Sequence, residues 1–205
     1  MEQGARSRIS YSPLLAGYPL GGSPLMAHEL IIGVSGGIAA YKTAMLVSSL
    51  VQEGHGVSVV MTRSARKFIG AATFRALTGR PVAIQPFDAH FPLGAHIELA
   101  DKANLLCIAP ASADIMAKAA SGLADDLLST LLLSFAGPIV FAPAMNSAMW
   151  EKRPVQRNIE TLRADGHHFV DPQTGWQSCR RSGKGRMAEP ADIQTAIERL
   201  LSNKK

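Results

Sequence analysis

The sequence predicts an α/β protein with a doubly wound parallel sheet, and two observations predict it. From Glu29 onward, short apolar runs that are typical of β-strands alternate with longer segments of helical pattern. Strands that alternate with helices imply a parallel sheet covered by helices on both faces. The chain of 205 residues is 47% hydrophobic and 18% charged, which is the composition of a globular protein with a full core. We therefore expect residues 28–205 to form one domain.

The first half of this domain begins with a strand that runs into a glycine loop. Gly54 and Gly56 then separate a helix from the second strand, because glycine interrupts both patterns, and Thr78-Gly79 ends the next helical stretch. The predicted elements are strand 30–34, loop 35–38, helix 39–53, strand 57–61, one or two helices over 64–77 and a weak strand 82–84.

The second half repeats the alternation and ends in an amphipathic helix. The predicted elements are helix 97–103, strand 105–109, helices 112–121 and 125–135, strand 139–142, helix 147–165, a sheet-ending strand at 169–170 and helix 191–201. In the last helix, apolar residues recur at helical spacing, at Ile193, Ala196, Ile197, Leu200 and Leu201.

Residues 1–27 differ from the rest of the chain in composition. They are rich in Gly, Pro and Ser, and the stretch 14–27 is too interrupted for the core of a signal peptide. We expect a disordered extension, in which Met26 is a candidate native start. No apolar run approaches the roughly 20 residues that span a bilayer, and we expect a cytoplasmic protein.

The two cysteines are too few for a disulfide framework, and their surroundings differ. Cys107 falls in the apolar run 105–109 and is predicted to be a buried strand residue. Cys179 is a candidate reactive thiol, because nearby positive charge stabilises a thiolate. Free thiols suit a reducing cytoplasm.

The formal net charge is +5, and part of it is concentrated around Cys179. A short basic stretch with two glycines contains Arg180, Arg181, Lys184 and Arg186. Such a loop can hold a phosphorylated small molecule or a nucleic-acid backbone, or it can simply be solvated. Because aromatic and basic residues are not interleaved, we expect no nucleic-acid partner, and the lack of a long apolar run argues against a membrane. A phosphorylated small molecule and a solvated loop remain the two interpretations.

The glycine loop Gly-Val-Ser-Gly-Gly-Ile (33–38) joins the first strand to the first helix. Glycines let the backbone approach a phosphate, and a helix N-terminus favours its negative charge. The loop is neither a G-x-G-x-x-G fingerprint nor a Walker loop, and no acid follows the second strand to hold a ribose. This pattern favours a mononucleotide, to which Thr62 and Ser64 can add hydroxyl donors. The alternative is a tight turn with no ligand.

The segment Pro-Ala-Met-Asn-Ser-Ala-Met-Trp (143–150) follows the predicted strand 139–142. The carboxyl edge of an open α/β sheet is where ligands bind. Asn146 can donate and accept hydrogen bonds, so it can hold a carboxylate without adding charge. The alternative is a strand-to-helix turn in which Asn146 caps the helix and Met149 and Trp150 are core residues.

One histidine, His96, directly precedes the predicted helix 97–103. Histidine titrates near neutrality, which suits proton transfer, although a capping or surface histidine has the same local pattern. The other histidines show no metal-ligand spacing, so we expect no metal site. They are His28, His55, His90, His167 and His168.

Five motifs, in order and at consistent spacing, resemble those of the flavin-containing cysteine decarboxylases. They are Gly-Val-Ser-Gly-Gly-Ile-Ala-Ala-Tyr-Lys (33–42), His-Ile-Glu-Leu (96–99), Ala-Pro-Ala-Ser-Ala-Asp (109–114), Pro-Ala-Met-Asn-x-x-Met-Trp (143–150) and Gly-x-Gly-Arg-Met (183–187). The resemblance covers residues 29–201. It implies a Rossmann-like, flavodoxin-type three-layer sandwich that binds FMN. It also implies an active site between the subunits of a homotrimer, which can assemble into dodecamers.

The resemblance implies roles for individual residues. His96 is the expected active-site base, Asn146 the group that holds the substrate carboxylate, and Cys179 the acid that completes the reaction. The loop 175–189 is expected to close over the substrate. FMN is expected to contact Ser35, Gly36, Gly37, Ile38, Ala39, Thr62, Ser64, Phe68, Ala111, Ser112 and Met145. The substrate is expected to contact Asn146, Met149, Gly183, Lys184, Gly185, Arg186 and Met187.

The activity implied by the resemblance is FMN-dependent decarboxylation of 4′-phosphopantothenoylcysteine to 4′-phosphopantetheine in coenzyme A biosynthesis. A cysteine carboxylate has no electron sink, and oxidation of the thiol-bearing carbon by FMN supplies one. The alternatives are a peptidyl-cysteine decarboxylase, a flavin prenyltransferase and a non-catalytic flavin-binding regulatory subunit. The basic Gly-x-Gly-Arg-Met segment favours a phosphorylated small molecule over a peptide, and Pro-Ala-Met-Asn argues against a prenyltransferase. His96, Asn146 and Cys179 together favour an enzyme.

Two positions depart from the family's pattern. Asp114 stands where the family has Asn, so an amide donor is lost. Arg180 stands where the family usually has Gly, and it adds a phosphate-seeking cation. Many bacterial members carry a C-terminal synthetase domain. Because this sequence ends at Lys205, we expect a separate enzyme to supply the preceding step.

Overall fold

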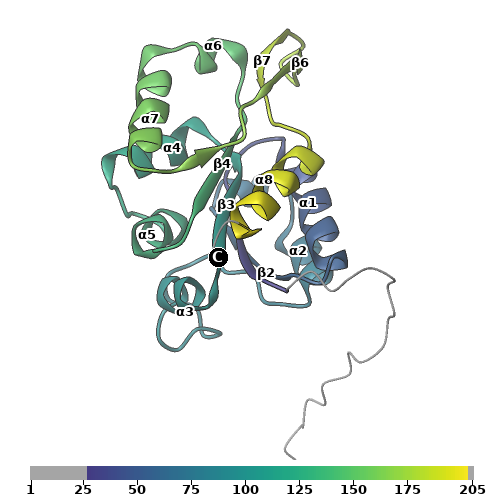
Figure 1. The fold of residues 1–205 in the computed structure, drawn as a ribbon, viewed down its shortest axis with the longest axis vertical. Helices are drawn as coiled ribbons and strands as arrows, with labels where there is room; N and C mark the ends of the chain where they lie inside the picture. Colours follow the sequence, from purple (N-terminus) through teal and green to yellow (C-terminus); the bar gives the residue numbers. More distant parts are fainter. Residues whose placement is uncertain (1–26, 203–205) are drawn as a thin grey trace, which may run out of the picture.

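The computed structural model describes residues 27–202, which form a three-layer α/β sandwich (Figure 1). All neighbouring strands of the central sheet are parallel, and their order is β2-β1-β3-β4-β5. The strands are β1 (Glu29–Val34), β2 (Gly56–Met61), β3 (Leu105–Ala111), β4 (Ile139–Pro143) and β5 (His168–Phe169). This is the flavodoxin-like order, so the predicted fold is confirmed. The predicted extension and the candidate start at Met26 lie outside the described residues, apart from Ala27.

Helices cover both faces of the sheet (Figure 1). One face packs against α1 (Ala40–Gln52), α2 (Ala71–Thr78) and α8 (Pro190–Ser202), and a 3₁₀ turn, η1 (Ala65–Lys67), precedes α2. The other face packs against α3 (Ala95–Lys102), α4 (Ala113–Ser121), α5 (Leu127–Ser134), α6 (Ser147–Trp150) and α7 (Arg153–Ala164). Strand side chains alternate between the two cores, as a pleated sheet requires.

Gly33 in β1 shows how closely the second helical layer approaches the sheet. A Cβ at this position would lie 2.6 Å from Ile108 Cδ1 and 2.6 Å from Leu128 Cδ1. Only glycine therefore fits here without repacking β3 and α5. The close approach of α5 fixes the position of the adjacent glycine loop.

The predicted helix over 147–165 is wrong, because the structure contains two helices, α6 and α7, with a break at 151–152. Pro154 lies in the first turn of α7, where its missing N–H costs nothing. In a continuous helix, its ring would clash with the carbonyl group of Trp150. That carbonyl instead accepts a hydrogen bond from Gln156 Nε2.

The weak strand predicted at 82–84 forms only an isolated parallel bridge between Ala83 and Val60. The sheet-ending strand predicted at 169–170 is β5, one residue earlier. The remaining predicted strands and helices are confirmed, with ends that shift by a residue or two.

The segment expected to be a loop over 175–189 is largely an antiparallel hairpin. It is formed by β6 (Gln173–Trp176) and β7 (Ser182–Arg186), which make a separate two-stranded sheet. Figure 1 shows this hairpin projecting from the body of the molecule, on the side to which α6 also belongs. The segment is rich in glycine and charged residues, which are uncommon in strands, so its local pattern does not predict a hairpin.

Candidate active site

A cleft of about 470 Å³ lies at the carboxyl edge of the sheet. Its walls are the glycine loop with the start of α1, the segment between β4 and α6, and the β6–β7 hairpin. The chain turns to β2 on one side of β1 and to β3 on the other, so this edge is a topological switch point. Ligands of open α/β sheets bind at that point.

The glycine loop presents unused backbone donors to this cleft. Residues 36–39 line it, and within residues 27–202 none of their four N–H groups forms a hydrogen bond. They lie at the N-terminus of α1, where the helix dipole favours an anion. Gly36 also packs against Ser64, since a Cβ there would lie 2.6 Å from Ser64 Oγ. The loop is therefore suited to hold a phosphate.

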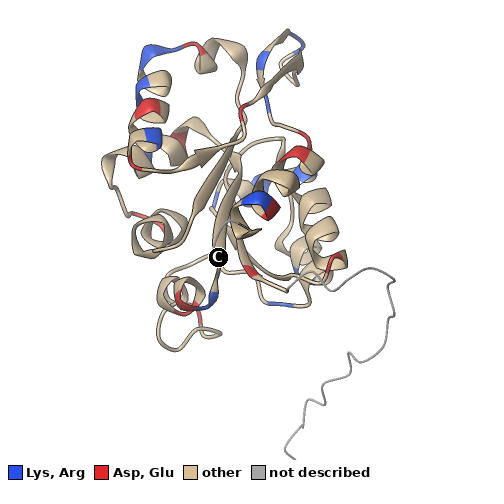
Figure 2. Cartoon of the chain, viewed as in Figure 1, with Lys and Arg blue, Asp and Glu red and all other residues tan. Residues whose placement is uncertain are grey.

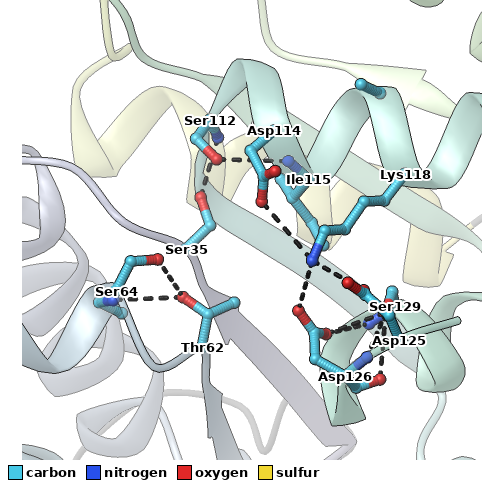
Figure 3. Close-up of polar contacts among 12 residues, drawn as sticks. Ser35, Thr62, Ser64, Ser112, Asp114, Ile115, Lys118, Asp125, Asp126 and Ser129 are labelled. Atoms are coloured by element: carbon cyan, nitrogen blue, oxygen red, sulfur yellow. Dashed lines mark hydrogen bonds and ion pairs between the residues drawn. The ribbon is translucent and has the colours of Figure 1, made fainter. Parts of the chain in front are cut away.

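Figure 3 shows four hydroxyl groups in or next to the glycine loop, those of Ser35, Thr62, Ser64 and Ser112. Ser35 Oγ donates to Pro110 O at 2.7 Å and accepts from Ser112 N at 2.8 Å, so it ties the loop after β1 to the loop after β3. Thr62 Oγ1 and Ser64 Oγ lie 3.1 Å apart. Thr62 borders a second hollow of about 340 Å³ rather than the cleft. Of the residues predicted to contact the flavin, Ser112 therefore lies on the side of the cleft, and Thr62 lies on the side of the second hollow.

Among the other predicted flavin contacts, Ser112 and Met145 line the cleft, whereas Ala111 is buried in β3. Phe68 is half exposed and lies outside both hollows.

A charged cluster supports the helices beside the site (Figure 3). Lys118 lies 2.7 Å from Asp125, 3.0 Å from Asp126 and 3.8 Å from Asp114. Burial alone would lower the pKa of Lys118, but hydrogen bonds to Asp125 and Asp126 raise it. Asp114, the departure from the family's pattern, does not line the cleft. Its carboxylate pairs with Lys118 in the first turn of α4, where a negative charge is favourable.

Asn146 satisfies both interpretations of the segment after β4. Its Oδ1 accepts from Met149 N at 2.9 Å, which makes it the cap of α6, and it also lines the cleft. Within residues 27–202, its Nδ2 forms no hydrogen bond and can serve a ligand. Met149 lines the cleft, whereas Trp150 is a core residue.

Cys179 lies at the tip of the hairpin, in a three-residue loop of residues 178–180. Arg180 N donates to Gln177 O, and Gln177 N donates to Arg181 O, both at 2.9 Å. Arg180 has a φ of 63°, as the third residue of such a loop requires, and glycine adopts this conformation without strain. The turn presents Cys179 to the cleft.

The base of the hairpin is held to α1 by charges that the sequence did not single out. Lys42 is buried, and its Nζ lies 2.9 Å from Glu189 Oε1 and 3.2 Å from Met187 O. Glu189 also accepts from Arg186. The hydrogen bond from Lys42 holds the pKa of Glu189 below its usual value. Gly185, Arg186 and Met187, which we expect to contact the substrate, line the cleft.

Lys184 does not line the cleft, and neither does Gly183. The Lys184 ammonium lies 5.6 Å from the centre of the Trp150 ring. Figure 2 shows that basic residues recur along the hairpin and on α7.

His96 is the one predicted catalytic residue that the structure does not bring to the cleft. It lies in α3, which Figure 1 shows at the opposite end of the molecule from the hairpin. Within the described residues, His96 Nδ1 is buried without a hydrogen-bond partner. Sequence reasoning also missed Gln177, a buried hairpin residue that bonds to Ser147 and Met145, about thirty residues away along the chain.

Cys107 is buried in β3 as predicted, and burial raises the pKa of its thiol to about 12. Between residues 27 and 202, no group of three or more His, Cys, Asp or Glu side chains could hold a metal ion. None of the helices in that range has both the length and the apolar character needed to span a membrane.

Curated relatives match most of this chain. The coenzyme A biosynthesis bifunctional protein CoaBC of Mycobacterium tuberculosis is 45% identical over 173 residues, and that of Bacillus subtilis is 43% identical over 173 residues. Each match covers 84% of this chain, but 41% and 43% of the respective relative. The chain therefore spans about two fifths of the length of these relatives.

Solved structures are similar over the same region. The FMN-dependent cysteine decarboxylase SpaF has a TM-score of 0.75 and 34% identity, over 88% of this chain and 98% of that chain. A PPC decarboxylase mutant complexed with pantothenoylaminoethenethiol has a TM-score of 0.77 and 26% identity, over 86% of this chain and 100% of that one. The Flavoprotein family model matches residues 23–202. On this match, the chain belongs to the Flavoprotein family.

Proposed function

We propose that this chain decarboxylates 4′-phosphopantothenoylcysteine to 4′-phosphopantetheine with FMN as cofactor, a step of coenzyme A biosynthesis. The observation that carries the proposal is the cleft, which joins the glycine loop, Asn146 and Cys179 at one edge of the sheet. These groups can respectively hold a phosphate, hold a carboxylate and supply a proton. The CoaBC relatives and the PPC decarboxylase structure support this substrate over others.

The residues at the sheet edge fit a flavin mononucleotide. Four unused N–H groups at a helix N-terminus suit its phosphate, and the hydroxyl groups of Thr62, Ser64 and Ser112 suit its ribityl chain. Met145 and the half-exposed Ile38 line the cleft and offer apolar surface for its ring. When bound, FMN would accept a hydride from the carbon that bears the substrate thiol and return it after CO₂ is lost.

The chain's own side chains would orient the substrate and move protons. Asn146 Nδ2 would donate to the substrate carboxylate, because Oδ1 is already engaged by Met149 N. Arg186 lines the cleft and offers a cation for the substrate phosphate. The Cys179 thiol would give its proton to the substrate in the last step. The hairpin would exclude water while these steps occur.

We propose that His96 acts from a second copy of the chain, in a homotrimer or a multiple of three. His96 lies outside the cleft of its own chain, yet a base is needed there. A closed ring of copies would bring the α3 helix of one chain toward the cleft of the next. The His96 side chain is partly exposed in the single chain, so part of its ring is open to a second copy.

The direct test is mass spectrometry of 4′-phosphopantothenoylcysteine incubated with the purified, FMN-loaded protein. The expected result is loss of CO₂ and formation of 4′-phosphopantetheine. A peptide with a C-terminal cysteine serves as the competing substrate, because a peptidyl-cysteine decarboxylase is the alternative enzyme that shares the flavin site. Decarboxylation of the peptide alone would overturn the proposed substrate, and decarboxylation of neither would overturn the enzyme assignment.

The cofactor has its own test. Flavin released from the purified protein by heat is separated by chromatography, and the expected species is FMN. Recovery of FAD, or failure to bind FMN after reconstitution, would contradict the assignment of the glycine loop.

A further inference from the structure

Gln177 is a buried side chain at the junction between the hairpin and the segment after β4. It is 8% exposed. Its Nε2 lies 3.5 Å from Met145 O, 3.4 Å from Gly183 O and 3.3 Å from Lys184 O. Gln177 directly follows β6, and its amide joins β7 to the segment that carries Asn146.

The other end of the same amide faces the thiol. Gln177 Oε1 accepts from Ser147 N at 3.1 Å and from Cys179 Sγ at 3.5 Å. The amide can have only this orientation, because a rotated amide would place its oxygen against three carbonyl oxygens and its NH₂ against the Ser147 N–H. An acceptor is thus fixed beside the Cys179 sulfur.

This acceptor discriminates between the two states of the thiol. An amide oxygen accepts a hydrogen bond from S–H but repels a thiolate, so it favours the protonated form. The charged and titratable groups nearby act in the opposite sense, because cations stabilise a thiolate. From the hairpin they are Arg180, Arg181, Lys184 and Arg186, and from α1 they are Tyr41 and Lys42. Glu189 pairs with Lys42 and Arg186 and offsets part of their charge. The segment after β4 contributes the uncharged Asn146, Ser147 and Met149.

We propose that Gln177 is the positioning residue of Cys179: it keeps the thiol protonated against the surrounding cations and directs it into the cleft. A residue that must deliver a proton has to carry it until the last step. The catalytic meaning of this contact rests on the proposed function. The contact itself does not, and it can be tested without substrate.

The test is the rate at which iodoacetamide alkylates the full-length protein near neutral pH. The chain has two cysteines, and Cys107 is fully buried, so alkylation of the folded protein reports Cys179. Gln177→Leu removes the acceptor, and alkylation is expected to accelerate about threefold to tenfold, the factor that one hydrogen bond supplies. Gln177→Glu places a carboxylate beside the sulfur and is expected to slow alkylation below the wild-type rate.

Comparison of Gln177→Leu with Gln177→Glu distinguishes a direct effect of Gln177 on the thiol from a general loosening of the hairpin. Both lose the NH₂ group that binds three carbonyls, so a merely loosened hairpin would accelerate alkylation in both. Gln173→Leu is the matched control: Gln173 lies in the same hairpin and donates to Asp192 Oδ2 at 2.8 Å, far from the thiol. It is expected to leave the alkylation rate unchanged.

Equal acceleration by Gln177→Leu and Gln177→Glu, or no change in either, would overturn the proposal. If neither variant folds, Gln177→Asn keeps the amide on a shorter stem that withdraws it from the sulfur. It is expected to accelerate alkylation less than Leu would, and a wild-type rate would overturn the proposal. If the alkylation pattern holds while no substrate is decarboxylated, the proposed function fails and the role of Gln177 in holding the thiol stands.

Discussion

Asn146 combines two roles that a single atom cannot perform. Its Oδ1 caps α6, and its Nδ2 is left to face the cleft. The cap fixes the orientation of the amide, because the Met149 N–H requires an acceptor. A structural contact therefore prepares the donor that we assign to the substrate carboxylate.

Two substitutions at this position separate the roles. Asn146→Asp keeps the capping oxygen but loses the donor and adds a negative charge. We expect little change in the free energy of unfolding and at least about a tenfold loss of decarboxylation, the value of a hydrogen bond to a charged group. Asn146→Ala should lose the activity and also about 1 kcal/mol of stability. Urea unfolding and a product assay measure the two effects, and an active Asp variant would exclude the assigned role.

Cys179→Ser is expected to separate the two halves of the reaction. A serine hydroxyl is a far weaker acid than a thiol. In the proposed reaction, oxidation and CO₂ loss do not need the Cys179 proton, whereas formation of phosphopantetheine does. The variant should release CO₂ about once per site and accumulate an oxidised, decarboxylated product. Isotopic CO₂ release and mass spectrometry measure both quantities. Phosphopantetheine formation at the wild-type rate would show that Cys179 is an ordinary loop residue.

At the scale of elements, the hairpin loop stores backbone strain at Arg180. The left-handed conformation costs free energy for a residue with a Cβ, because the Cβ crowds the backbone, whereas glycine adopts it without this cost. We expect Arg180→Gly to be more stable than Arg180→Ala by about 0.5–1 kcal/mol, although both lose the same guanidinium. Thermal unfolding of the two variants measures the difference. Equal stabilities would mean that the loop does not adopt this turn in solution.

The connection between α1 and β2 makes stability depend on pH. His55 accepts from His28 N at 3.3 Å, and within the described residues its Nε2 is buried without a partner. Burial, and then the neighbouring His28, lower the pKa of His55, and burial also lowers that of His167. The unfolded chain therefore takes up these protons at a higher pH than the folded chain does.

The free energy of unfolding is consequently expected to be highest above about pH 6.5 and to fall as the pH drops below that value. His55→Asn, which can retain the acceptor for His28 N, should flatten this dependence. Urea unfolding between about pH 7.5 and about pH 5.5 measures the slopes. Identical slopes in the variant and the wild type would remove His55 from the effect. Carboxylates with lowered pKa values, such as that of Glu29 bound to Arg80, act only at more acidic pH.

The elements that the sequence predicted well are those whose pattern is local. Strands β1, β3 and β4 are buried on both faces, so they read as continuous apolar runs. The glycine loop was likewise evident, because the phosphate-binding role that we propose for it depends on its own backbone. The hairpin was not, since Gly175, Gly183 and Gly185 interrupt any strand pattern and its fit to the segment after β4 is tertiary. A Cβ at Gly185 would collide with Met145 O, a constraint that no local pattern reveals.

At the scale of the whole molecule, α3 and the hairpin lie far apart, and this leads to a prediction about oligomers that contain two different variants. His96→Asn and Cys179→Ser should each be inactive alone. If His96 acts on the cleft of a neighbouring copy, a co-refolded equal mixture should regain roughly a quarter of the wild-type activity, the statistical fraction of intact sites. An inactive mixture, or a monomer by light scattering, would mean that the site is not shared between copies.

The hairpin is tethered at both ends, and this has a consequence for the chemistry of the proposed proton donor. It leaves the sheet after β5 and rejoins the core through the buried Met187 and Ala188, just before α8. A thiol on such a tether is an intramolecular reagent, whose effective concentration far exceeds that of a solute. A small free thiol at millimolar concentration therefore cannot replace Cys179. The proton donor is therefore part of the chain, and its concentration at the cleft is set by the fold and not by the surrounding solution.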